Sequence, residues 1–309
     1  MSNYVEEKKL LVVAMENSKR RGIFFSVMAV SKIFVAIAVQ LIFILINKAE
    51  SSAYAYTQYV LGGATVIAVI AAMTRAYNLK FVESVRLNKT GAKYYLLALL
   101  LFVGMVFGLS SLNGYFISFL EKFGYKYTEP PLPEFSALNY ILVSLTICIL
   151  PAVYEEFAFR GFIVGGLGGA GKIPVALVTA FLFSIYHSSP AQTVYQFAVG
   201  FCFALLAIES GSVIPTMIVH FMNNFLIVNA YYFWGGGVDF GTVGNIIATV
   251  IGVASIVVFL VLTLKGKKGE KAENGTFASK WFILRSFIFA ALIGTIAYLA
   301  LWIINLLNV

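Results

Sequence analysis

Nine long apolar runs cover most of this 309-residue chain and constrain its fold more than any other feature. A helix that crosses the hydrocarbon core of a bilayer needs about 20 predominantly apolar residues. The runs are continuous rather than alternating, and buried backbone polar groups must be paired in lipid, so helices are favoured over a barrel. The runs lie at roughly 23–46, 57–74, 94–118, 137–162, 173–187, 192–209, 212–233, 243–264 and 281–307.

The predicted fold is therefore all-α: a polytopic transmembrane helical bundle of about eight or nine spans. The count is open because the runs 173–187 and 192–209 are short and closely joined, and a single hairpin could hold both. We expect one integral membrane domain in three parts: N-terminal helices (1–136), a central helical core (137–233) and C-terminal helices (234–309).

Composition supports a membrane protein and argues against a nucleic-acid partner. Hydrophobic residues make up 60% of the chain and charged residues 12%, whereas soluble domains are about half apolar and about a quarter charged. The net charge of +8 could suggest nucleic acid. The basic residues, however, fall almost entirely in loops between apolar runs, as the positive-inside rule predicts for membrane proteins. Membrane lipids are therefore the expected surroundings.

The distribution of charge also predicts an orientation. Basic residues gather in the N-terminal segment and in the loops 75–93 and 265–280, while the opposite loops hold only three lysines. Positively charged loops stay on the cytoplasmic side. We therefore predict a protein of the plasma membrane with its N-terminus in the cytoplasm, its C-terminus outside and no cleavable signal peptide.

Both histidines of the chain and the only acidic residues well inside the apolar runs lie close together in the sequence. They are the adjacent carboxylates Glu155 and Glu156 and the two histidines of the chain, His187 and His220. An ionisable group at membrane depth is costly, and chains that keep one usually use it. All four fall within about 70 residues, which indicates a functional site in a polar cavity that opens toward the cytoplasmic side.

The two carboxylates are expected to differ in role. Glu156 and Arg160 are four residues apart, so they share a helix face and can form an ion pair that supports the site. Glu155 is rotated by about 100° and stays free to act as a general base. Pro151 frees the backbone carbonyl of Ile147, so a bend is expected before the pair. The alternative is an ion-pair cluster that only caps the end of the helix.

The histidines suggest a second set of roles. His220 and Asn224 share a helix face and offer two N–H donors of the kind that stabilise an oxyanion. His187 ends its run just before a Ser-Ser-Pro break. Alternatives are a hydrogen bond between helices for the first pair and a favourable helix C-terminus for His187. Helix rise places Glu155 and His220 at ~10–12 Å depth but His187 at ~20 Å.

These residues resemble the motifs of the CAAX protease and bacteriocin-processing (CPBP, or Abi) family of intramembrane proteases, which includes the Ras-converting endopeptidases. The resemblance covers about residues 137–233 and rests on three short motifs in order. They read Glu155-Glu156…Arg160, Phe183…His187 and His220…Asn224.

The resemblance implies a glutamate-dependent endopeptidase. In that family-based picture Glu155 and His187 activate a water molecule, and His220 and Asn224 stabilise the oxyanion. No cofactor and no metal ion are expected. The substrate would be a membrane-associated peptide or protein, either prenylated at a CAAX C-terminus or of another type.

Three other functions remain open at this point. A zinc hydrolase could use the carboxylates and histidines as ligands, although the HExxH spacing is absent. An immunity or scaffold protein of the same fold would use the cluster only for packing. A proton-coupled transporter would also keep glutamate and histidine in its spans, but the two halves of the chain show no matching interrupted helices.

Overall fold

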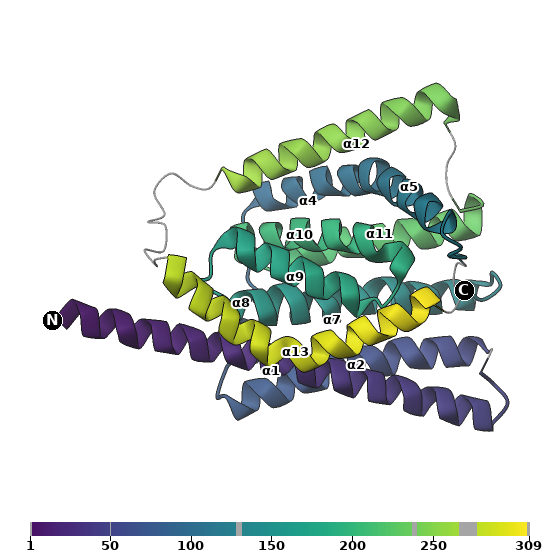
Figure 1. Ribbon diagram of the computed structural model, residues 1–309. Helices are drawn as coiled ribbons and strands as arrows, with labels where there is room; N and C mark the ends of the chain where they lie inside the picture. The colour runs from purple at the N-terminus through teal and green to yellow at the C-terminus, as the bar shows by residue number, and fades with distance from the viewer. Residues whose placement is uncertain (1, 50, 128–131, 237–239, 266–276, 308–309) are drawn as a thin grey trace.

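The computed structural model describes residues 2–49, 51–127, 132–236, 240–265 and 277–307. These residues form helices and no strand, which confirms the all-α prediction (Figure 1). The α-helices are α1 (Ser2–Leu45), α2 (Ser52–Ala76), α3 (Phe81–Ser84), α4 (Ala92–Gly104), α5 (Ser110–Glu121), α6 (Ala137–Val143), α7 (Leu150–Glu156), α8 (Val164–Gly166), α9 (Lys172–Tyr186), α10 (Thr193–Ser210), α11 (Ile214–Phe233), α12 (Gly241–Leu264) and α13 (Phe277–Leu307). The π-helical turns are η1 (Met105–Leu109), η2 (Ser144–Ile149) and η3 (Phe157–Ile163), and η4 (Pro190–Gln192) is a 3-10 turn.

Seven helical segments in the described part of the chain are long and apolar enough to cross a membrane, so the protein is an integral membrane protein. The other two predicted spans form α9, which has only 15 residues, and α11, which has 20. The α11 helix carries His220, Asn223 and Asn224 among its apolar residues. The seven are Glu6–Leu45, Ser52–Ala76, Ala92–Glu121, Ala137–Gly166, Pro190–Ser210, Gly241–Leu264 and Ser279–Leu307.

Two helices extend further than the apolar runs indicated. The α1 helix begins at Ser2 and runs for 44 residues, about 66 Å, so the basic N-terminal segment is helical rather than a loop. The fourth span continues past residue 162 through η3 and α8 to Gly166. This second extension matters for the site, because it places the two glutamates deeper below the helix end than the sequence suggested.

A central group of helices is packed between other helices on two opposite sides. Figure 1 shows α7, α9, α10 and α11 in the middle, α4 and α12 on one side, and α1, α2 and α13 on the other. The contact between α1 and α13 is close, because Ser18 Oγ donates to the Ile283 carbonyl at 2.7 Å and Ser26 Oγ to the Ala290 carbonyl at 2.8 Å. Small polar residues let helices approach in this way in lipid.

The basic segments gather at one end of the bundle. In Figure 1 this end holds the start of α1, the α2–α4 connection, the last turns of α12 and the first turns of α13. The described C-terminus lies at the opposite end. Residues 266–276 of the predicted basic loop 265–280 lie outside the described residues. The arrangement agrees with the charge pattern, whereas the cytoplasmic assignment of this end and the three-part division of the chain stay predictions.

Candidate active site

The two glutamates lie in a stretch of irregular helix. The short helix α7 stands between the π-helical turns η2 and η3, and Pro151 is at its start. π-Helical turns inside α-helices are frequent at functional sites, and proline removes a backbone donor there. Glu155 is 6% exposed and Glu156 is fully buried. The helix is therefore irregular on both sides of Pro151, where the sequence predicted a local kink, and this stretch carries two carboxylates into the bundle.

The carbonyl that Pro151 leaves without its usual donor receives one from another helix. Asn224 Nδ2 of α11 donates to the Ile147 carbonyl at 3.1 Å. The side-chain oxygen of Asn224 accepts from Asn223 Nδ2 at 3.3 Å, and Tyr195 donates its hydroxyl to Asn223 Oδ1 at 2.7 Å. Asn224 thus stabilises this irregular stretch with one amide hydrogen and keeps the other for a further acceptor.

Glu156 is the paired carboxylate. Its Oε1 lies 3.0 Å from Arg160 Nη1 and 2.9 Å from His220 Nδ1. Arg160 is also fully buried and donates through Nη2 to the Gly200 carbonyl at 3.4 Å. The predicted Glu156–Arg160 pair is therefore present, and it also holds the ring of His220.

The guanidinium group of Arg160 lies among aromatic rings. Its central carbon is 4.1 Å from the ring centroid of Phe183 and 5.0 Å from that of Phe203. Cations are attracted to aromatic faces when water is excluded. Phe183 also offers its carbonyl to His187, so this residue joins the second motif to the first. Phe183 is part of the sequence motif, but its contacts with Arg160 and His187 are seen only in the structure.

Hydrogen bonding fixes the orientation of both imidazole rings. His187 Nδ1 lies 2.8 Å from the Phe183 carbonyl, and a carbonyl can only accept, so this nitrogen carries the proton. His220 Nδ1 faces the carboxylate of Glu156 at 2.9 Å and donates for the same reason. In the neutral rings each Nε2 is then an acceptor with a free lone pair.

Both Nε2 atoms face the same carboxylate oxygen. Glu155 Oε2 lies 3.9 Å from His187 Nε2 and 3.9 Å from His220 Nε2. Neither distance is a direct hydrogen bond. Among the described residues, Glu155 Oε2 has no hydrogen-bond partner although it is buried. Three acceptors therefore converge without a donor, and a water molecule between them would donate its two hydrogens to two of the three.

The difference in depth between His187 and Glu155 is smaller in the structure than the sequence predicted. Because the fourth span continues to Gly166, Glu155 lies eleven residues, or ~16 Å, before the helix end. His187 follows the 15-residue helix α9 and lies ~22 Å from its start. The remaining difference of roughly 6 Å is within the reach of two side chains.

Lys32 is a neighbour of the site that the sequence reasoning did not include. Its ammonium group lies 3.6 Å from the ring centroid of Tyr186, the residue before His187. The sequence could have indicated this residue, because a lysine within a span is as costly as a glutamate or histidine there and is therefore also a candidate functional residue.

The structure brings five of the six predicted site residues into one connected cluster, and Asn224 lies beside them at the Ile147 carbonyl. The cluster consists of Glu155, Glu156, Arg160, His187 and His220. Within the described residues, no three His, Cys, Asp or Glu side chains form a group that could hold a metal ion.

Comparison with known proteins identifies the region that holds this cluster. The family model described as type II CAAX prenyl endopeptidase Rce1-like matches residues 137–226. No curated protein and no solved structure matches the chain. Residues 137–226 are therefore similar to this peptidase domain, which supports the family that the motifs suggested. The predicted resemblance is thereby confirmed.

Proposed function

We propose that the protein is a membrane-embedded endopeptidase in which Glu155 and His187 activate a water molecule. The observation that carries the proposal is the convergence of three acceptors on one position: Glu155 Oε2 lies 3.9 Å from Nε2 of both His187 and His220. A water molecule there donates to two bases, which makes its oxygen a better nucleophile. The bases must also be held in a fixed orientation, and each histidine ring is held through its Nδ1 atom.

The reaction follows from these positions. The water oxygen bonds to the carbonyl carbon of the scissile peptide while Glu155 takes its proton. The carbonyl oxygen becomes an oxyanion. His220, whose Nδ1 donates to Glu156, first takes a proton from solvent on Nε2, and this N–H then donates to the oxyanion. The carbon–nitrogen bond then breaks, and the leaving nitrogen takes the proton from Glu155.

Asn224 has a smaller part in this proposal than its motif suggests. One of its amide hydrogens is bound to the Ile147 carbonyl, so it can offer only the second to the oxyanion. Glu156 and Arg160 do not touch the water position. They hold His220, and they do so as a buried ion pair whose two side chains are fully shielded from solvent.

The substrate class comes from the family description. The matching model is described as a CAAX prenyl endopeptidase, and we extend this class, a substrate prenylated at a CAAX C-terminus, to the present chain. A second class, an unprenylated membrane-associated peptide, is separated from it by a pair of peptides that differ only in the prenyl group. Faster cleavage of the prenylated peptide supports the first class, and equal rates support the second.

The activity itself is tested by proteomics of C-terminal fragments in membranes from cells that express wild type, Glu155→Gln or Glu83→Gln. Glu83 is a matched control, because its side chain is 67% exposed and its ion-pair partner among the described residues is Lys80, which is also exposed. We expect new C-termini with wild type and Glu83→Gln but not with Glu155→Gln. Identical fragment sets in all three would instead favour a non-proteolytic immunity or scaffold protein of the same fold.

The sequence left a zinc hydrolase open, because imidazole nitrogens and a carboxylate are zinc ligands, although no three such side chains of the described residues are arranged to hold a metal ion. A strong chelator distinguishes the two cases. Cleavage that survives chelation supports activated water without a metal. Cleavage that is lost on chelation and restored by added zinc supports the zinc peptidase.

A further inference from the structure

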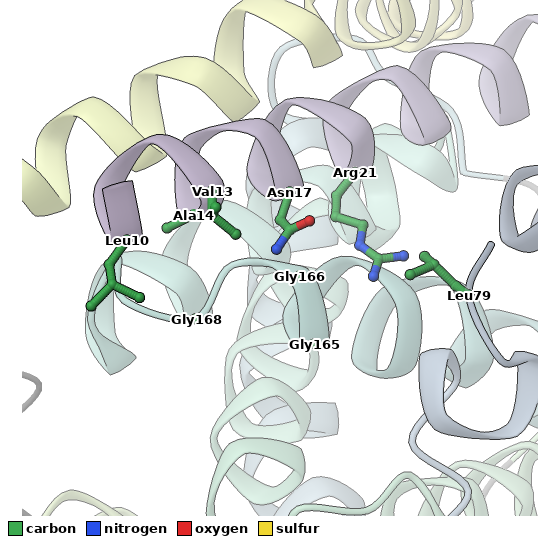
Figure 2. A pocket seen from close by; sticks show the side chains of 9 residues that line it. All are labelled: Leu10, Val13, Ala14, Asn17, Arg21, Leu79, Gly165, Gly166 and Gly168. Carbon is green, nitrogen blue, oxygen red and sulfur yellow. The ribbon is translucent and has the colours of Figure 1, made fainter. Parts of the chain in front are cut away.

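A second polar position lies at the end of the bundle where the basic segments gather, and none of its lining residues belongs to the candidate active site. A pocket of about 280 Å³ opens between the first half of α1 and the turn that follows α8 (Figure 2). It is lined by Leu10, Val13, Ala14, Asn17, Arg21, Leu79, Gly165, Gly166 and Gly168. No acidic side chain of the described residues lines it.

Arg21 is the charged group of this pocket. Its Nε and Nη1 atoms are buried and have no hydrogen-bond partner within the described chain. A buried donor without a partner is costly, more so when it is charged, and a water molecule or an ion is one of the partners that can satisfy it. The guanidinium carbon lies 3.8 Å from the ring centroid of Phe162, which fixes the plane of the group. Figure 2 shows Arg21 between α1 and the glycines of the opposite wall.

The acid nearest in sequence is engaged elsewhere. Glu16 Oε1 accepts from Arg20 Nε at 3.3 Å, and this pair is partly exposed. Arg20 and Arg21 are thus adjacent arginines with different surroundings: one has a carboxylate partner, and the other faces a pocket without one. This difference makes Arg20 a matched control for Arg21.

The opposite wall is built from small residues. A methyl group added to Gly166 would collide with the Arg21 side chain, so only glycine lets the guanidinium group lie where it does. A methyl group added to Gly165 would come within 3.0 Å of the Arg86 side chain. Two arginine side chains therefore flank this pair of glycines. Positive charge and space occur together here, as an anion requires.

We propose that this pocket binds a phosphate group, with Arg21 Nε and Nη1 as its donors and the Asn17 amide beside them. Arginine binds phosphate through two parallel N–H bonds. Leu10 and Val13 border the same pocket with side chains that are 65% and 58% exposed. An apolar surface next to the cation suits an amphiphile, so the ligand of best fit is the headgroup of a phospholipid. Free phosphate is the other source of the same chemistry.

The test is native mass spectrometry of the full-length protein in detergent. The probes are phosphatidylglycerol, a diacylglycerol with the same acyl chains, and inorganic phosphate. We expect retention of phosphatidylglycerol but not of diacylglycerol. Arg21→Gln should weaken that binding about tenfold, because it removes charge-assisted hydrogen bonds, whereas Arg20→Gln should leave it within about twofold.

A second variant keeps the test informative if Arg21→Gln does not fold. A side chain added at Gly168 meets no atom within 4 Å, and this residue lines the pocket. Gly168→Leu should therefore block lipid binding while Arg21 is unchanged. Retention of inorganic phosphate alone would assign the site to free phosphate. Equal binding of phosphatidylglycerol and diacylglycerol, or equal effects of the Arg20 and Arg21 variants, would overturn the proposal.

Discussion

The buried ion pair between Glu156 and Arg160 should be the most sensitive electrostatic contact in the described chain. Both side chains are fully buried and their charged atoms lie 3.0 Å apart. Removal of one member of such a pair leaves an uncompensated buried charge and costs about 3–5 kcal/mol. Arg160→Met should therefore lower the free energy of unfolding by about that amount.

The double variant Glu156→Gln/Arg160→Met tests the cause. It removes both charges, so it should recover about 1–3 kcal/mol relative to Arg160→Met. The amide oxygen of the new glutamine can still accept from His220 Nδ1, so the ring keeps its support. The assay is reversible unfolding in mixed micelles, followed by circular dichroism for the wild type, both single variants and the double variant.

An exposed pair on the same protein provides the control cycle. Lys80 and Glu83 lie 2.8 Å apart, but their side chains are 81% and 67% exposed. Solvent screens such pairs, and they contribute little. The Lys80→Met and Glu83→Gln variants should show no resolvable coupling. The reasoning would be refuted if the losses of unfolding free energy at Glu156 and Arg160 were strictly additive, so that this pair showed no more coupling than the exposed pair.

Two further predictions concern the backbone around the site. Asn224→Ala leaves the Ile147 carbonyl without its donor and should lower the free energy of unfolding by about 1–3 kcal/mol. In a Pro151→Ala background the restored backbone N–H can serve that carbonyl, so the same substitution should cost less in thermal unfolding; equal losses in both backgrounds would contradict this assignment. Gly161→Ala should destabilise the protein, because its methyl group would collide with the backbone after α3. Gly91→Ala is the control, since a methyl group there meets nothing within 4 Å, and equal melting temperatures for the two variants would show that the contact is looser than described.

Much of this site could be predicted from local sequence. The four-residue spacing of Glu156 and Arg160 predicts their pairing, because it depends only on helix geometry. The freed carbonyl of Ile147 follows from the chemistry of Pro151 alone. The fold class follows from the length of the apolar runs. In each case the cause lies within one helix.

The remainder depends on contacts between helices. The sequence placed His220 and Asn224 together as donors to an oxyanion, but the structure binds His220 to Glu156 and Asn224 to the Ile147 carbonyl. Which partner each side chain finds is decided by the packing of α11 against α7. The π-helical turns η2 and η3 are also absent from any local pattern, since helix spacing alone does not reveal the extra residue in a turn.

The central claim is that Glu155 and His187 share the activation of one water molecule. It is tested most directly by the turnover rate of purified protein in liposomes, with a prenylated C-terminal peptide as substrate. We predict that Glu155→Gln and His187→Gln each lower kcat by about 10²–10⁴-fold, whereas Glu83→Gln leaves it unchanged. Wild-type turnover in either site variant would contradict the account.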